Sequence, residues 1–136
     1  MTKKNKLKES HLQLIMNTEA ITNIVSEVYS SLGGGYSERV YHTAVEVSLR
    51  KLGIQYESER IVPINFKGHV VGNLRADIIV NNEVVLEFKT IKSLNDQGEL
   101  QVQNYLNLLG LKKAFLINFP PFPNRDPEIR CIESLT

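Results

Sequence analysis

Two carboxylates and one ammonium group interrupt the most apolar stretch of the chain, which runs from Arg75 to Ile91. Asp77, Glu87 and Lys89 stand among Ile, Val, Leu and Phe residues that read as two strands joined by a polar Asn-Asn turn. Charged side chains on buried strands are costly unless they pair with each other or hold a metal ion. We therefore treat these three residues as a candidate site.

The register of this hairpin decides which face carries each carboxylate. Glu87 and Lys89 share a face, because alternate residues of a strand point the same way. A two-residue turn would put Asp77 and Glu87 on opposite faces, whereas a three-residue turn, from Asn81 to Glu83, would make them direct partners. Such partners have Cβ atoms roughly 5 Å apart, close enough to share one divalent cation. We predict the three-residue turn or a bulge, since a slip of one residue reverses every face.

Two interpretations of the charged residues follow. Carboxylate oxygens from Asp77 and Glu87 suit Mg²⁺ or Mn²⁺, which polarises a phosphoryl oxygen and lowers the pKa of bound water. Lys89 could then orient the attacking water or neutralise charge in the transition state. The alternative is an internal salt bridge that joins either carboxylate to Lys89 or Arg75. The spacing alone leaves both interpretations open.

The rest of the chain predicts an α/β layered domain with a mixed sheet. Apolar periodicity and glycine or proline punctuation indicate the elements. They are an N-terminal helix from about Leu12 to Leu32, a glycine break at 33–35, a helix from about Ser37 to Leu52, a meander of strands over 54–66, 69–80 and 83–91, a helix from about Gln97 to Leu109, and strands over 113–119 and 128–132.

Composition bounds the class of protein. A hydrophobic content of 42% and a charged content of 23% are typical of one globular domain, which we place at residues 11–136. Residues 1–10 form a basic arm with four lysines, which we interpret as a disordered or frayed tail in preference to a phosphate-attracting arm. The net charge of +1 argues against tight, non-specific binding of nucleic acid. No apolar run is long enough to span a membrane, so we expect no membrane partner.

The single cysteine, Cys131, excludes an internal disulfide and fits a reducing, cytoplasmic compartment. Its apolar neighbours predict a buried structural thiol.

Four segments together resemble a known family. Tyr-Ser-Glu-Arg-Val-Tyr at 36–41, Ala-Asp-Ile-Ile-Val at 76–80, Glu-Phe-Lys at 87–89 and Gln-Val-Gln-Asn-Tyr-Leu at 101–106 are similar to the GxxExxY protein family, which is placed in the PD-(D/E)XK nuclease superfamily. The resemblance implies a restriction-endonuclease-like αβββαβ core, with a mixed central sheet flanked by helices, to which the N-terminal helix is an addition. The proline of the superfamily's name is absent, because Arg75 and Ala76 precede Asp77.

The resemblance also implies roles for five residues. Asp77 and Glu87 take the places of the Mg²⁺ ligands, and Lys89 takes that of the catalytic lysine. Glu38, otherwise a carboxylate favoured by a helix dipole, matches a further metal or water ligand. Gln101, otherwise a solvated helix residue, matches a glutamine that faces the site.

The expected function is therefore Mg²⁺-dependent hydrolysis of phosphodiester bonds in DNA or RNA. The alternative is an inactive nuclease fold that binds nucleic acid or a protein partner, which the near-neutral charge favours and the intact acid–acid–lysine set disfavours. A homodimer that spans a duplex is a further hypothesis.

Overall fold

A mixed five-stranded sheet in the order β1-β2-β3-β4-β5 forms the centre of the protein. The computed structural model describes residues 17–135. The elements are α2 (Thr18–Leu32), α3 (Glu38–Lys51), β1 (Tyr56–Phe66), β2 (His69–Val80), β3 (Val84–Lys89), α4 (Asp96–Leu109), β4 (Lys113–Asn118) and β5 (Glu128–Glu133). This architecture confirms the α/β prediction and the predicted element order.

The sheet begins as a meander and then changes direction. β1, β2 and β3 pair antiparallel, β3 and β4 pair parallel, and β5 returns antiparallel to β4. The parallel pair requires a crossover, which α4 supplies. Pro63 lies on β1, an edge strand, where its missing N–H costs no central ladder bond.

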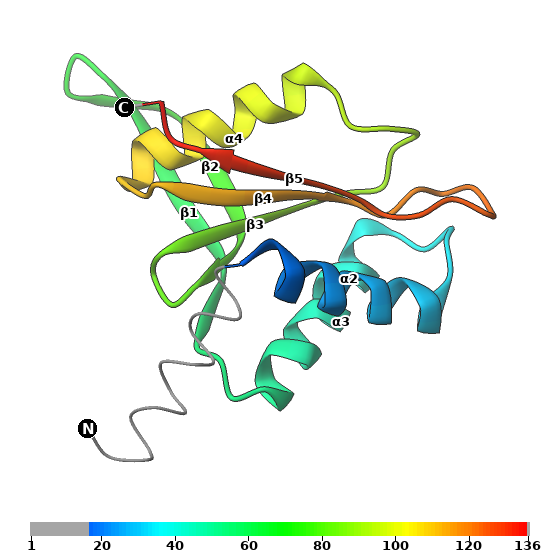
Figure 1. Cartoon of the computed structure of the whole chain (residues 1–136). Coiled ribbons are helices and arrows are strands. Elements are labelled where there is room, and N and C mark those ends of the chain that lie inside the picture. Colours follow the sequence, from blue (N-terminus) through cyan, green and yellow to red (C-terminus); the bar gives the residue numbers. More distant parts are fainter. Residues whose placement is uncertain (1–16, 136) are drawn as a thin grey trace, which may run out of the picture.

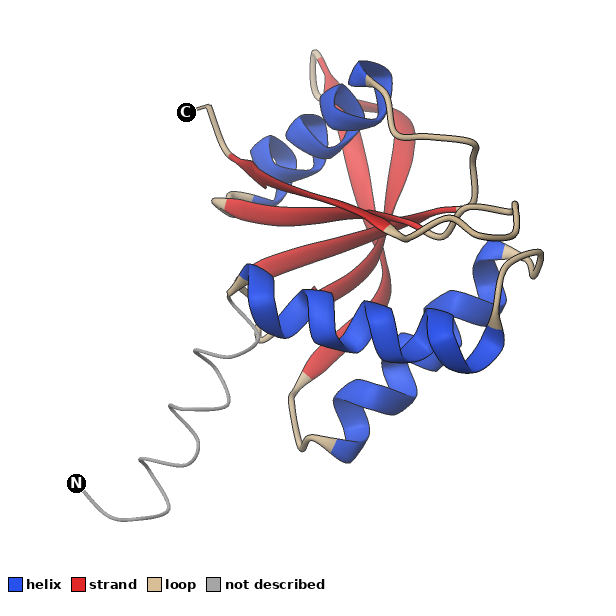
Figure 2. Ribbon diagram, turned by 45° about the vertical axis from the view of Figure 1, so that its right-hand side comes forward, coloured by secondary structure: helices blue, strands red, loops and turns tan. Residues whose placement is uncertain are grey.

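Helices cover both faces of the sheet (Figures 1 and 2). α2 and α3 lie on one face and share a core with Phe88 and Phe115 of the central strands. α4 lies on the other face, where Val102 and Leu106 pack with Leu116. The central strands are therefore buried on both sides, as their continuous apolar runs predict.

The predicted N-terminal helix begins with Asn17, whose side-chain oxygen accepts a hydrogen bond from the Ala20 N–H at 3.1 Å and caps the first turn of α2. The part of this prediction that falls on residues 12–16, and the basic arm at residues 1–10, lie outside the described residues. Among the described residues, no helix combines the length and the apolar character that crossing a bilayer requires.

The glycine break separates α2 from α3, as predicted. The Tyr41 hydroxyl donates to the Gly33 carbonyl at 2.6 Å, and the Tyr41 ring stacks on Phe119 with centroids 4.4 Å apart. Gly34 lies so close to the chain that an added Cβ would come within 2.8 Å of the Pro120 carbonyl oxygen. These contacts fix the first turn of α3, which carries Glu38, beside the sheet.

One prediction about a side chain is wrong. Cys131 is exposed rather than buried, because it lies on the edge strand β5. Apolar neighbours in the sequence do not ensure that other residues pack over the face of the strand that carries its side chain. On α4, Gln103 is partly buried and donates to the Glu133 carbonyl at 2.6 Å, which ties the helix to the end of β5.

Candidate metal centre

The turn between β2 and β3 sets the register of the site. Val80 pairs with Val84, and the Glu83 N–H donates to the Val80 carbonyl at 3.0 Å. Asn81 and Asn82 have positive φ angles of 51° and 55°, a region that asparagine tolerates better than most residues. The predicted three-residue turn is therefore confirmed.

This register brings Asp77 and Glu87 into direct contact. The Asp77 N–H donates to Glu87 Oε1 at 2.9 Å, and the Phe88 N–H donates to Asp77 Oδ2 at 2.9 Å. Both side chains are buried, with exposed fractions of 7% for Asp77 and 4% for Glu87. Each carboxylate thus accepts a hydrogen bond from a backbone N–H of the neighbouring strand, in place of a backbone carbonyl. These two hydrogen bonds hold both carboxylates at fixed positions between β2 and β3.

The facing of β2 changes at Asp77. Ala76 belongs to the core under α4, whereas Ile78, two residues later, belongs to the core under α2 and α3. Strict alternation would put these two residues on one face. Glu59, across from this point on β1, has a positive φ of 60°, and the β1–β2 pairing omits this position. Asp77 lies within electrostatic reach of His42 on α3, Lys89 on β3 and Arg75 on β2.

The site carries more negative charge than its surroundings can solvate. Burial, followed by repulsion from Asp77, raises the pKa of Glu87 to about 8. Burial also raises the pKa of Asp77, against the opposing effect of the Phe88 N–H. Partial desolvation and Asp77 raise the pKa of Glu38, and burial, with Glu87 and Asp77, raises that of the Tyr105 phenol to about 12. A bound cation would relieve all four shifts.

Lys89 lies beside the carboxylates without forming an ion pair with them. Its Nζ donates to Gln101 Oε1 at 3.0 Å. Among the described residues, no ion pair joins Asp77 or Glu87 to Lys89 or Arg75, and the Arg75 guanidinium instead lies 4.0 Å from Glu59. The purely structural salt bridge considered for these residues is thus not formed. Lys89 and Gln101 act as one hydrogen-bonded unit that joins β3 to α4.

Glu38 occupies a different position from the central pair. It is exposed in the first turn of α3, and it influences Asp77 and Glu87 through charge rather than through a hydrogen bond. In the part of the chain that the structure describes, no three His, Cys, Asp or Glu side chains gather closely enough to form a metal-binding group. The structure therefore brings Asp77 and Glu87 together, places Lys89 with Gln101 beside them, and leaves Glu38 outside that contact.

The central pair nevertheless suits a hard divalent cation. Asp77 Oδ1 and Glu87 Oε2 accept no hydrogen bond from the described residues. Neither atom is among the described side-chain atoms that are fully buried and lack a hydrogen-bond partner. Two carboxylate oxygens, supplemented by water, are the donors that Mg²⁺ uses in proteins. The fit rests on this donor chemistry and on the buried like charges.

Asn118 is a structural residue of the site that the sequence interpretation missed. It is fully buried on β4, opposite Lys89, and its amide exchanges two hydrogen bonds of 2.9 Å with the backbone of Ile91. It thereby anchors the chain immediately after Lys89. The detectable signal is a lone amide in the apolar run Phe-Leu-Ile-Asn-Phe, where a buried polar group requires partners.

Comparisons with known proteins place this geometry in a family. A search of curated proteins gives no match. A solved structure described as the crystal structure of SSO0001 is similar over 71% of this chain, with 27% identity and a TM-score of 0.55, and this chain spans half the length of that one. An alkaline exonuclease (LHK-Exo) from Laribacter hongkongensis is 11% identical, with a TM-score of 0.44, over 87% of this chain and 71% of that chain.

The family model described as the PD-(D/E)XK nuclease superfamily matches residues 16–132. This range contains strands β1 to β4, all of β5 except its last residue, and all five candidate residues. The chain belongs to the PD-(D/E)XK nuclease superfamily.

Proposed function

We propose that this protein is a divalent-metal-dependent nuclease that hydrolyses phosphodiester bonds in DNA or RNA. The observation that carries the proposal is the buried pair of Asp77 and Glu87, locked by reciprocal hydrogen bonds to backbone N–H groups beside a lysine that neither carboxylate neutralises. Membership of a nuclease superfamily supports it.

The residues take distinct roles in the proposed reaction. Asp77 and Glu87 would hold Mg²⁺ or Mn²⁺, and Glu38 would supply a third ligand or a contact to water. The metal ion, when bound, neutralises phosphate charge and lowers the pKa of a coordinated water. Lys89 would stabilise negative charge at the phosphoryl oxygens, with Gln101 fixing the direction of its ammonium group through their 3.0 Å hydrogen bond.

A second function is an inactive module that uses the same fold to bind nucleic acid or a protein. Two observations favour it: the net charge of only +1, and the absence of a gathered group of three ligating side chains among residues 17–135. Such a module need not bind metal at its carboxylates, which separates it from the nuclease.

Cleavage and metal binding should be measured on the same preparations. We expect Mg²⁺ or Mn²⁺ to support cleavage of at least one of four substrates, single- or double-stranded DNA or RNA. Asp77→Asn, Glu87→Gln and Lys89→Ala should each reduce the rate by at least about 100-fold, because the first two remove a proposed metal ligand and the third removes the positive charge beside the phosphate. Glu27→Gln and Lys67→Ala, at exposed positions on α2 and in the β1–β2 turn, are matched controls.

Calorimetric titration with Mn²⁺ completes the test. The wild type should bind Mn²⁺ and Asp77→Asn should not. A folded wild type that neither binds Mn²⁺ nor cleaves any of the four substrates would overturn the nuclease proposal and support the inactive module.

A further inference from the structure

A groove adjoins the candidate metal centre on the α4 side of the sheet. It has a volume of about 520 Å³ and lies between the first turns of α4 and the β3–α4 connection. Lys89 and Gln101, the hydrogen-bonded unit of the site, form part of its wall. Anything bound in this groove therefore lies next to Lys89, beside the candidate metal centre.

The groove combines apolar walls with unused amides. Leu74, Ile91 and Leu100 line it, and Leu100 is 64% exposed, so its side chain is available to a ligand. The side chains of Gln97 and Asn104 also line it, and neither forms a hydrogen bond with any described residue. Flat apolar contact together with amide donors and acceptors is the combination that holds a nucleobase.

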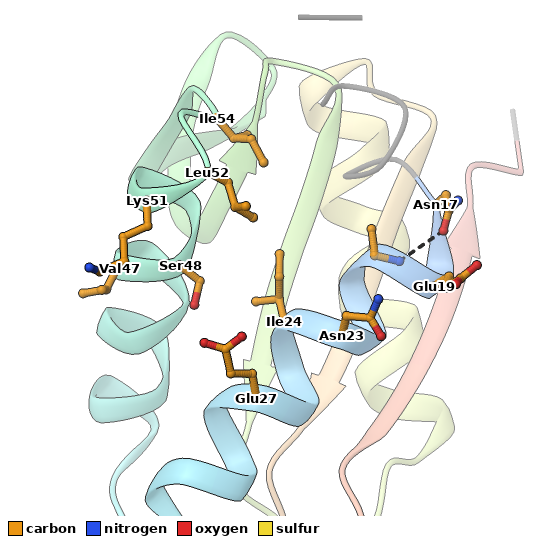
Figure 3. A pocket seen from close by; sticks show the side chains of 11 residues that line it. Asn17, Glu19, Asn23, Ile24, Glu27, Val47, Ser48, Lys51, Leu52 and Ile54 are labelled. Carbon is orange, nitrogen blue, oxygen red and sulfur yellow. Dashed lines mark hydrogen bonds between the residues drawn. The ribbon is translucent and has the colours of Figure 1, made fainter. Parts of the chain in front are cut away.

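The charge of the groove also suits a nucleotide. Lys89 is the one charged residue among those that line it, and no carboxylate does. A second hollow of similar size, about 510 Å³, lies between α2 and α3 and has the opposite character (Figure 3). There Glu19 and Glu27 of α2 outnumber Lys51 of α3, so the formal charge of the lining residues is net negative. Of these two hollows, the groove beside Lys89 is the one that has a net positive lining and adjoins the candidate metal centre.

The floor of the groove is held in place before any ligand binds. Asn118 fixes the backbone of Ile91, and the Leu94 N–H donates to Glu128 Oε1 at 3.1 Å. The Leu94 carbonyl accepts a hydrogen bond from Arg130 at 3.2 Å. A connection tied to β4 and β5 at three points loses little conformational freedom on binding, which favours affinity.

We propose that this groove binds the base of a nucleotide adjacent to the scissile phosphate, with Leu100 packing against the face of the base and Gln97 and Asn104 hydrogen-bonding its edge. The inference rests on the proposed nuclease function and extends it: the substrate must present an unstacked base here, so the enzyme acts on single strands, ends or flipped nucleotides. The sugar-phosphate backbone then continues from the groove past Lys89 toward Asp77 and Glu87.

Binding can be tested without any cleavage. Amide resonances of the ¹⁵N-labelled full chain should be followed during titration with deoxyadenosine 5′-monophosphate and, separately, with deoxyribose 5-phosphate, which lacks the base. We expect the mononucleotide to shift resonances of residues 95–104, and the base-less phosphate to leave most of them unmoved. Leu100→Ala and Asn104→Ala should abolish these shifts, whereas Leu108→Ala and Asn107→Ala, exposed on the same helix outside the groove, should retain them.

Cleavage supplies the second arm. Oligonucleotides with a single abasic position, moved stepwise past the cleaved bond, should show one position at which base removal slows single-turnover cleavage by about 5- to 100-fold, the range expected for one stacked base. In Leu100→Ala this sensitivity should disappear, while Leu108→Ala should keep it. Equal shifts by both titrants, or no sensitive position in an active enzyme, would overturn the base site. If the mononucleotide binds but no divalent metal ion supports cleavage, the nuclease function would be overturned and the base site would stand.

Discussion

Glu87 combines two properties that conflict in the absence of a cation: it is buried, and it lies against a second carboxylate. Its pKa of about 8, against an ordinary value of 4.5 in the unfolded chain, means that the native state binds more protons between these values. The free energy of unfolding should therefore fall as the pH rises from about 4.5 to about 8. Asp77, whose pKa is also raised, adds to the same slope.

Glu87→Gln should flatten this dependence, because a neutral amide keeps an oxygen for the Asp77 N–H and carries no charge to bury. Urea unfolding in metal-free buffer at several pH values measures the effect. The variant should exceed the wild type in stability at pH 8 by about 1–3 kcal/mol, the cost of an uncompensated buried charge. Glu27→Gln, on the exposed face of α2, should follow the wild type. A wild type that gains stability toward pH 8 would contradict the assignment.

At the scale of single residues, the sequence predicts the charged members of the site and misses the neutral ones. Asp77, Glu87 and Lys89 are conspicuous because each conflicts with an apolar strand. Asn118 carries no charge, and its structural role is a hydrogen bond with the Ile91 backbone that depends on the parallel pairing of β3 and β4. Such a contact joins residues 27 positions apart in sequence, so no local pattern reveals it.

At the scale of elements, the β2–β3 turn determines whether the site exists. Asn82 has a φ of 55°, and a β-branched residue there would be forced into the left-handed region at a cost of about 1–2 kcal/mol. Asn82→Val should lower the free energy of unfolding by this amount and weaken Mn²⁺ binding, since the strained turn competes with the register that joins Asp77 to Glu87.

Asn82→Gly is the matched control, because glycine adopts positive φ without strain. Both variants lose the 3.3 Å contact between Asn82 and Arg60, so their difference isolates the backbone effect. Chemical denaturation gives the stabilities, and calorimetry gives the affinities for Mn²⁺. Equal stability of the two variants would show that the turn does not control the register.

The predicted elements agree closely with the observed ones because periodicity, glycine breaks and polar turns are local signals. The register was predictable for a different reason: only one choice brought both carboxylates together. The exposure of Cys131 was not predictable, since it depends on which strand ends the sheet and on which face the helices cover. The change of facing at Asp77 likewise arises from the packing of two layers rather than from the residues beside it.

At the scale of the whole molecule, 16 basic and 15 acidic residues leave no strong field to attract a polyanion. Binding of nucleic acid should therefore depend on local contacts near Lys89 and Arg75 and show a weak dependence on salt. We expect a slope of about −2 to −3 for the logarithm of the association constant against that of the salt concentration, equivalent to two or three phosphates. Fluorescence anisotropy with Asp77→Asn and a labelled oligonucleotide measures this slope without cleavage.

The salt dependence also tests whether the basic arm at residues 1–10 contacts nucleic acid. If its four lysines each neutralised a phosphate, the slope would steepen by about 3 to 4. If the arm is only solvated, deletion of residues 1–10 should leave both slope and affinity unchanged. We expect the second result, because a binding mode based on one held base and on phosphate contacts near Lys89 and Arg75 needs few further charges. A slope that becomes shallower by three or more on deletion, at unchanged thermal stability, would instead assign nucleic-acid binding to the arm.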